Sequence, residues 1–201
     1  MSPHSQTHIA AVILAAGQSS RFGKPKQLIP FRGKSLLRGI IDAAAEADCS
    51  PIAVVLGSSR QQIERGLEKT DVLIVENRNW QQGIGTSIQA GVQHVIDRER
   101  DVDAIVLLVC DQPFVDARVI KELITLRKKT GKPIVASSYG ETLGVPALFG
   151  HCYFHELLAI NDTSGAKSVI LRNRERVTEV IFPEGKIDID TAEDYKRLTD
   201  L

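Results

Sequence analysis

The chain has 201 residues, of which 43% are hydrophobic and 25% are charged, with 25 basic side chains balancing 25 acidic ones. This length suits one well-buried α/β domain spanning residues 1–201 better than two domains. Because the net charge is zero, no global field attracts nucleic acid or an anionic membrane, and neither is expected as a partner.

The first eight residues, MSPHSQTH, are polar and are expected to form a flexible tail rather than a signal peptide. No apolar run in the chain approaches the roughly 18 residues of a membrane span. The three cysteines are an odd number and contain no CxxC pair, which argues against a disulfide framework or structural zinc. These features together predict a cytoplasmic protein.

Apolar runs rich in Val and Ile recur along the chain and are continuous rather than alternating, as expected of strands covered on both faces. These runs span residues 9–15, 51–57, 71–76, 103–109 and 132–138. Helical patterns span residues 35–47, 60–69, 85–100 and 116–129. This alternation predicts an α/β fold with a doubly wound, mostly parallel sheet and helices on both faces.

The rhythm changes after about residue 140, where a helix is predicted over 164–173, a strand over 177–182 and a final helix over 191–200. His151 and His155 could share one helical face. A zinc site there lacks further ligands nearby in sequence, so a packed or surface helix is expected. Trp80 either covers a bound nucleotide or anchors its own loop, and the sequence does not decide between these.

In such sheets, ligands bind outside the carboxyl ends of the strands. Small and polar residues follow three of the predicted strands, and the loops that carry them are expected to meet at one edge. Two familiar phosphate motifs fail, because Leu28 replaces the first glycine of a Walker loop and Ile88 the third glycine of a dinucleotide fingerprint.

The stretch IAAVILAAGQSSRFGKPKQL, residues 9–28, passes from a predicted strand into a loop of small residues and cations. Ala15, Ala16 and Gly17 leave the backbone uncovered, so that phosphates or a base can approach the main-chain N–H groups. Arg21 offers a planar fork for phosphate oxygens and Lys26 a mobile point charge. An ordinary turn with solvated cations is the alternative, but this spacing favours a phosphate site.

The segment LLVCDQP places Asp111 directly after a predicted strand, where a carboxylate is held rigidly enough to bind a hard cation such as Mg²⁺. The alternative is that Asp111 only caps the turn before the helix that begins near Asp116. Considered together with the first loop, the metal interpretation is favoured.

The segment LAAGQSSRFGKPKQL resembles the pattern LAAGxSxRxGxPKxL of the molybdenum cofactor cytidylyltransferase group within the MobA-like NTP transferases. Further similar segments follow in the same order at residues 76–91, 108–113, 144–149 and 188–195. The resemblance spans almost the whole chain and implies a Rossmann-like nucleotidyltransferase fold.

The resemblance also implies a role for individual residues. Catalysis would fall to Arg21, Lys26 and Asp111. The nucleotide would contact Leu14, Ala15, Ala16, Gly17, Ser19, Ser20, Arg21, Lys26, Asn77, Gly83, Ser87 and Asp111. The metal would be held by Asp111 and by Asp190, with Asp188 as the alternative to Asp190. The acceptor would contact Gln112, Gly144, Pro146, Asp162 and Lys167.

One segment departs from the family pattern. Where the family carries GDxGAR, this chain reads NDTSGAK over residues 161–167, which is one residue longer and ends in Lys instead of Arg. Lysine keeps the positive charge but not the bidentate fork of arginine. Thr163 and Ser164 would alternatively be caps of a helix start.

The activity implied is transfer of CMP from CTP, or of another nucleotide from its triphosphate, to a molybdopterin-type acceptor, with Mg²⁺ and release of pyrophosphate. The product would serve a molybdenum hydroxylase, so that such an enzyme or its accessory proteins are candidate partners. LAAG rather than LAGG favours a pyrimidine nucleotide. Two alternatives remain: a sugar or polyol phosphate acceptor, and a non-catalytic nucleotide-binding protein that inserts the cofactor.

Overall fold

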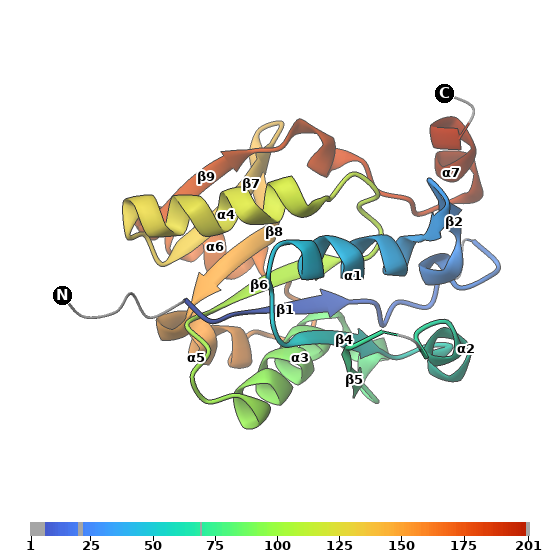
Figure 1. The fold of residues 1–201 in the computed structure, drawn as a ribbon, viewed down its shortest axis with the longest axis horizontal. Helices are drawn as coiled ribbons and strands as arrows, with labels where there is room; N and C mark the ends of the chain where they lie inside the picture. Colours follow the sequence, from blue (N-terminus) through green and yellow to red (C-terminus); the bar gives the residue numbers. More distant parts are fainter. Residues whose placement is uncertain (1–6, 20–21, 69, 200–201) are drawn as a thin grey trace.

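A computed structural model of the chain describes residues 7–19, 22–68 and 70–199. Most of its strands form one central sheet (Figure 1). These strands are β1 (Ile9–Leu14), β4 (Ile52–Leu56), β5 (Leu73–Glu76), β6 (Ala104–Val109), β7 (Ile134–Tyr139), β8 (Thr142–Gly150) and β9 (Val177–Ile181). They lie in the order β5-β4-β1-β6-β8-β7-β9.

Four of the strand pairs in this sheet are parallel. β1 pairs in parallel with β4 and β6, β4 with β5, and β7 with β9. β8 runs antiparallel to both of its neighbours, β6 and β7. The predicted doubly wound, mostly parallel sheet is therefore confirmed, and the reversal at β8 explains the change of rhythm after residue 140.

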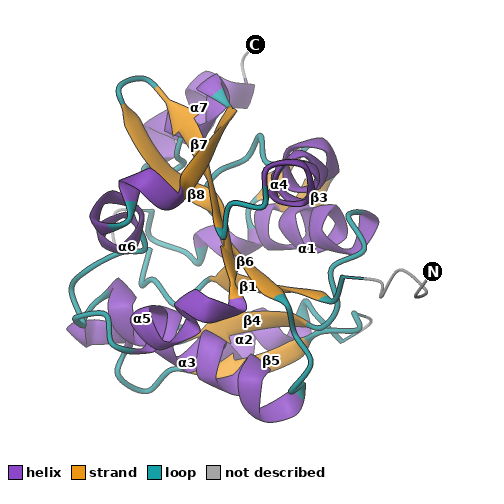
Figure 2. Ribbon diagram, turned by 90° about the vertical axis from the view of Figure 1, so that its left-hand side faces the viewer, coloured by secondary structure: helices purple, strands orange, loops and turns teal. Residues whose placement is uncertain are grey.

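Helices cover both faces of the sheet (Figure 2). They are α1 (Leu36–Glu46), α2 (Arg60–Arg65), α3 (Ile84–Arg98), α4 (Ala117–Thr130), α5 (Phe154–Leu158), α6 (Lys167–Arg172) and α7 (Ala192–Thr199). Alternate residues of β1 enter two different cores. Ile9, Ala11 and Ile13 pack with α1, α2 and α4, whereas Ala10 and Val12 pack with α3, α5 and α6. This two-sided burial is why the strand reads as a continuous apolar run.

Some elements differ from the prediction. The helix expected over 60–69 ends at Arg65, before Gly66, and the predicted final helix begins at Ala192. A short hairpin of β2 (Pro30–Phe31) and β3 (Lys34–Ser35) was not predicted. Its two central residues both have positive φ, as a type I′ turn requires.

Residues 1–6 of the predicted tail lie outside the described residues. Next to them, the backbone N–H of His8 donates to Asp103 Oδ2 at 2.8 Å, so this residue is tied to the segment before β6. Among the helices that the structure describes, each is too short or too polar to cross a membrane.

The order of the strands positions the functional edge. From β1 the chain builds β4 and β5 on one side of the sheet, and then returns to build β6 on the other side. The loops that leave the carboxyl ends of β1 and β6 therefore diverge at this edge, which is the position where open α/β sheets bind ligands.

Close packing of α3 on the sheet depends on Gly91. A methyl group added there would lie 2.4 Å from Val12 Cγ1 and 2.8 Å from Val55 Cγ2. Gly91→Ala is expected to destabilise the protein by about 1–3 kcal/mol, because overpacking outweighs the gain of helix propensity.

Gly39 in α1 is the matched control, since an added methyl group there meets nothing within 4 Å. Gly39→Ala should stabilise the protein by about 0.5–1 kcal/mol. Urea unfolding of both variants measures the two changes. Shifts of the same sign would contradict the close approach of α3.

Candidate active site

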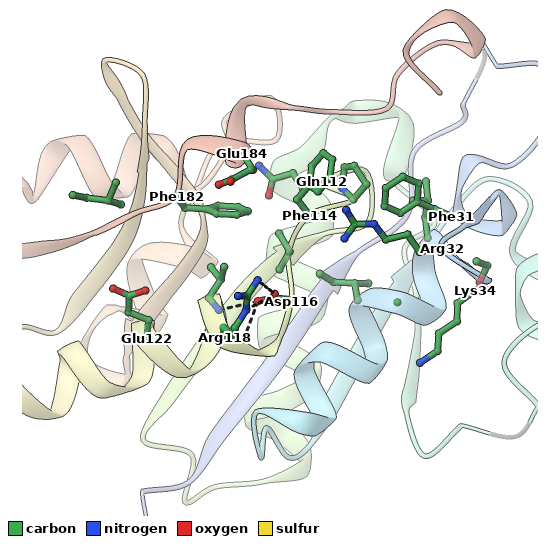
Figure 3. Close-up of a pocket in the computed structure, with 18 residues that line it drawn as sticks. Phe31, Arg32, Lys34, Gln112, Phe114, Asp116, Arg118, Glu122, Phe182 and Glu184 are labelled. Atoms are coloured by element: carbon green, nitrogen blue, oxygen red, sulfur yellow. Dashed lines mark hydrogen bonds and ion pairs between the residues drawn. The ribbon is translucent and has the colours of Figure 1, made fainter. Parts of the chain in front are cut away.

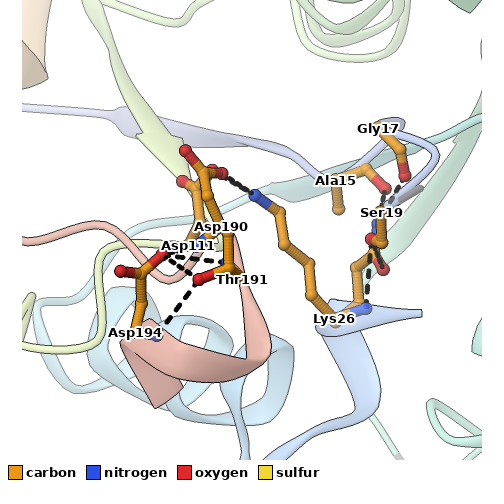
Figure 4. Close-up of polar contacts among 9 residues, drawn as sticks. Ala15, Gly17, Ser19, Lys26, Asp111, Asp190, Thr191 and Asp194 are labelled. Carbon is orange, nitrogen blue, oxygen red and sulfur yellow. Dashed lines mark hydrogen bonds and ion pairs between the residues drawn. The ribbon is translucent and has the colours of Figure 1, made fainter. Parts of the chain in front are cut away.

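Three side chains that are distant in sequence meet at the edge of the sheet (Figure 4). The Lys26 ammonium lies 2.7 Å from Asp111 Oδ2 and 2.9 Å from Asp190 Oδ1. The Lys26 side chain is only 12% exposed, whereas Asp111 is 26% and Asp190 53% exposed. The predicted cation and the two predicted metal ligands therefore form one connected unit that opens to solvent on the Asp190 side.

Lys26 is positioned by the loop that follows β1. The buried Gln27 side chain donates to the carbonyls of Ala15 at 2.8 Å and Gly17 at 3.1 Å. The Ser19 hydroxyl accepts from the Lys26 backbone N–H at 3.1 Å. Gln27 was not among the predicted site residues. The sequence signal that pointed to it was an amide side chain within the PKQL segment, next to the predicted Lys26.

Of the three small residues predicted to leave the backbone uncovered, the structure exposes Gly17, whereas Ala15 and Ala16 are engaged in backbone hydrogen bonds with β4 itself and with the segment after β4, respectively. Leu14, Ala15 and Ala16 are buried, whereas Gly17 is exposed. A Cβ at Gly17 would meet nothing within 4 Å. The predicted contacts of Ser20 and Arg21 lie outside the described residues.

The two carboxylates are held by backbone contacts of their own. Asp111 follows β6 after one residue, and its carbonyl accepts from the Ile189 N–H at 2.9 Å. Thr191 and Asp194 cap the start of α7 reciprocally, since Asp194 Oδ2 accepts from the Thr191 N–H at 2.9 Å and Thr191 Oγ1 from the Asp194 N–H at 3.1 Å. These bonds fix the segment that carries Asp190.

Asp111 does not cap α4, which was the alternative interpretation. Asp116 is the cap of that helix and accepts from the backbone N–H groups of Arg118 at 2.9 Å and Val119 at 3.2 Å. The Asp111 carboxylate therefore pairs with Lys26 instead of with the backbone of α4, and it remains partly exposed.

The charges at this edge perturb one another. Burial alone would lower the pKa of Lys26, but the adjacent Asp111 and Asp190 carboxylates raise it well above its usual range. Partial desolvation and repulsion from Asp111 and Asp190 raise the pKa of Asp188 to about 6. Burial and the Asp111 charge raise the pKa of the Cys110 thiol to about 12. Lys26 is therefore charged and Cys110 protonated near neutral pH.

The residues at this edge fit a divalent cation. Carboxylate oxygens are the ligands that Mg²⁺ prefers. In this structure the Lys26 ammonium lies between the carboxylates of Asp111 and Asp190. Asp188 lies beside this pair, and burial, together with the charges of Asp111 and Asp190, raises its pKa. In the described residues, neither at this edge nor around His151 and His155 is a group of three or more His, Cys, Asp or Glu arranged to hold a metal ion, so this edge offers a cation two carboxylates.

Two predicted nucleotide contacts are engaged inside the protein. The buried Asn77 side chain donates to Thr86 Oγ1 at 2.8 Å and to Ser87 Oγ at 2.9 Å. This network joins the loop after β5 to the first turn of α3. Trp80 packs closely against Gly57 after β4, a contact that favours Trp80 as the anchor of its own loop.

Gly83 and Gly85 are crowded by another segment. Cβ atoms there would lie 2.4 Å from the Asp162 carbonyl oxygen and 2.1 Å from that of Asn161, respectively. The Gly85 N–H donates to Asp162 O at 2.7 Å. The Asp162 and Lys167 side chains are exposed, and α6 begins at Lys167 without a side-chain cap from Thr163 or Ser164. The NDTSGAK segment thus packs against the start of α3 and is hydrogen-bonded to it through Asp162 O.

The predicted acceptor side is built around Tyr139, which was not predicted. Its hydroxyl donates to the Val145 carbonyl at 3.1 Å, and a Cβ at Gly144 would lie 2.1 Å from that hydroxyl. The buried Gln112 amide donates to the Gly185 carbonyl at 2.7 Å. The Pro146 carbonyl accepts from Ser137 Oγ at 2.7 Å. Gln112, Gly144 and Pro146 are therefore buried and engaged in contacts inside the protein.

A groove of about 790 Å³ lies on the α1 and α4 side of the Asp111 loop (Figure 3). Phe31, Phe114 and Phe182 form its apolar walls. The Arg32 guanidinium lies 5.2 Å from the Phe31 ring centroid and 5.1 Å from that of Phe114. Gln112 lines the groove and also donates to the Gly185 carbonyl.

Gln27→Leu is expected to destabilise the protein by about 1–3 kcal/mol, because two loop carbonyls lose their buried donor. Gln93→Leu is the control, since Gln93 is exposed and donates to Asp97 within α3, and its effect should stay within about 0.5 kcal/mol. Chemical denaturation measures both variants. Equal effects would show that the Gln27 amide does not hold the loop.

Asp188→Asn is expected to change the pH dependence of stability in chelator-treated protein. Because the native pKa of about 6 lies above the ordinary 3.8, the native state holds the extra proton between these values. Wild-type stability is then lost as pH rises through this window, and the variant gains relative to wild type above about pH 6. The difference should vanish below about pH 4.

Asp194→Asn provides the opposite sign, because hydrogen bonds from Thr191 lower the pKa of Asp194. Its loss of stability should be present at neutral pH and disappear as the wild-type carboxyl is protonated at low pH. Thermal unfolding between pH 3 and pH 8 measures both variants. A gain for Asp188→Asn that persists at pH 3 would contradict the charge crowding.

Known proteins resemble this chain over most of its length. The MobA-like NTP transferase domain matches residues 11–177. Nicotine blue oxidoreductase of Paenarthrobacter nicotinovorans is 26% identical over 203 residues, covering 94% of this chain and 96% of that protein. The bifunctional protein GlmU of Desulfitobacterium hafniense (strain Y51) is 34% identical over 122 residues, covering 59% of this chain and 25% of that protein. This chain thus spans about a quarter of the length of GlmU.

Solved structures share the fold. Rv0371c of Mycobacterium tuberculosis H37Rv superposes with a TM-score of 0.80 at 29% identity, covering 97% of this chain and 100% of that one. A structure of the same protein in complex with manganese has a TM-score of 0.76 at 28% identity, covering 96% and 99%. The family match includes the loops after β1 and β6 that carry Lys26 and Asp111. The chain therefore belongs to the MobA-like NTP transferase family.

Proposed function

We propose that this chain is a Mg²⁺-dependent cytidylyltransferase that transfers CMP from CTP to a molybdopterin-type acceptor and releases pyrophosphate. Its product would serve the maturation of a molybdenum hydroxylase. The convergence of Lys26, Asp111 and Asp190 carries this proposal. These residues come from three separate motifs. Asp111 and Asp190 lie 85 and 164 positions after Lys26 in the sequence, and yet both accept hydrogen bonds from its ammonium.

The charges suit attack of one phosphate on another. An anionic acceptor and an anionic triphosphate repel each other, so that positive charge and fixed orientation are what the site must supply. Lys26 would donate to oxygens of the α-phosphate, where negative charge builds in the transition state. Mg²⁺ held by Asp111 and Asp190 would neutralise the phosphates and align them. A phosphate monoester is already largely ionised near neutral pH, so no general base is required.

The open backbone at Gly17 supports nucleotide binding beside Lys26, because phosphates could approach the main chain there. The manganese complex of Rv0371c supports a divalent cation in this fold. LAAG in the first loop is the reason to place a pyrimidine there. The segment around Tyr139, Gly144 and Pro146 is the proposed acceptor side.

Two further functions remain as alternatives of different kinds. The site would equally suit a sugar or polyol phosphate acceptor, because the chemistry at the α-phosphate is the same. A protein that binds nucleotide only to deliver a cofactor would need no turnover. In addition to these two, the nearly full-length similarity to nicotine blue oxidoreductase supports an oxidoreductase activity as an alternative, and a separate assay tests it.

Pyrophosphate release with CTP, GTP, ATP or UTP, each with and without molybdopterin, tests the proposal. Release only with CTP and molybdopterin together is expected. Release with CTP and a sugar or polyol phosphate instead would move the proposal to that acceptor. No release with any pair would contradict an enzyme of this class, and turnover of nicotine blue by the same preparation with an added electron donor or acceptor would favour a redox role.

Lys26→Ala and Asp111→Ala should each lower turnover by about 100-fold or more, because each removes charge that acts at the transition state. Lys24→Ala is the matched control, since Lys24 is an exposed cation two positions from Lys26 and should retain activity. Circular dichroism verifies that the variants are folded. Near wild-type turnover of either Lys26→Ala or Asp111→Ala would remove that residue from the proposed mechanism.

A further inference from the structure

We infer that the Lys26 ammonium is an internal counter-ion that competes with a divalent cation for Asp111 and Asp190. A metal ion would then bind the nucleotide-free protein only weakly, because it must first displace this ammonium. The inference rests on the proposed function, since it concerns how the same site is controlled before nucleotide arrives. It assigns Lys26 a second role, distinct from contacting phosphate.

The competition follows from shared atoms. The ammonium lies at 2.7 Å from Asp111 Oδ2 and 2.9 Å from Asp190 Oδ1, which are oxygens that a hard cation would use. Two cations cannot both lie at this range from the same oxygens without strong mutual repulsion. Since the Lys26 side chain is only 12% exposed, water screens this repulsion incompletely.

The geometry indicates which partner would move. The carboxylates are attached to a fixed frame, because Asp111 O accepts from the Ile189 N–H and the capped start of α7 follows Asp190. The backbone of Lys26 is also anchored, through its N–H to Ser19 Oγ. The four-carbon stem of Lys26 is the flexible part, and it can swing the ammonium without moving the loop.

Triphosphate would provide the released ammonium with a new partner. Gly17, on the same loop, is exposed and uncrowded, so that phosphates could arrive beside Lys26. Transfer of the ammonium from the carboxylates to phosphate would free Asp111 and Asp190 for the metal. Binding of nucleotide and binding of metal would then favour each other, as reciprocal coupling requires. The metal is accordingly expected to bind with the nucleotide rather than before it.

Mn²⁺ binding to the nucleotide-free protein tests the inference, with free Mn²⁺ measured by electron paramagnetic resonance. Lys26→Met, which removes the ammonium but keeps an apolar stem, should bind Mn²⁺ at least about tenfold more tightly than wild type. Lys26→Arg keeps the charge and should remain as weak as wild type. Lys24→Met removes a nearby exposed charge and should also change little.

Adding Asp111→Asn to Lys26→Met should abolish the gain, which places the ion at this site. If Lys26→Met does not fold, Lys26→Gln is measured in its place. Mn²⁺ binding by the folded Lys26 variant no tighter than wild type, or an equal gain in Lys24→Met, would overturn the inference. Because neither CTP nor acceptor is present, this result is independent of cytidylyl transfer. Failure of the pyrophosphate assay with a retained Mn²⁺ gain would contradict only the proposed function.

Discussion

The ion pairs of Lys26 with Asp111 and Asp190 impose the main constraint on this molecule. They require the loop after β1, the loop after β6 and the segment before α7 to arrive at one point of the sheet edge. Strand order satisfies the first two, because β1 and β6 are neighbours whose connections diverge. The bond from the Ile189 N–H to Asp111 O then brings the third segment to the second.

Hydrogen bonds to backbone groups join the segments that carry the site. Gln27 ties the first loop through two carbonyls, and the Asp162 carbonyl caps the start of α3 at Gly85. Position 85 requires glycine because any Cβ there would collide with the carbonyl of Asn161, which precedes Asp162 in this contact. The region proposed for the acceptor is thereby joined to the region proposed for the nucleotide. Each buried polar group that lost its partner here would cost about 1–3 kcal/mol.

Several residues that the family pattern places at the ligand have structural partners as well. Asn77 and Ser87 are bonded to each other in the interior, and Gln112 supports the Gly185 turn. Their side chains would influence a ligand mainly by fixing the shape of its pocket. Lys26, Asp111 and Asp190 differ, because within the part of the chain that the structure describes their charged side chains bond to one another. Charge therefore concentrates where the proposed chemistry needs it.

The sequence by itself determined the α/β class and the central strands, because continuous Val and Ile runs are possible only where both faces are covered. It also determined the chemical types at the sheet edge, since LAAG and Asp111 lie at the ends of predicted strands and Lys26 lies in the loop after the first of them. Only the tertiary structure decided that Lys26 contacts both carboxylates, that β8 is reversed, and that Gln27 and Tyr139 support the site. Those features depend on contacts between residues far apart in the chain, and local patterns of hydrophobicity and spacing contain no record of such contacts.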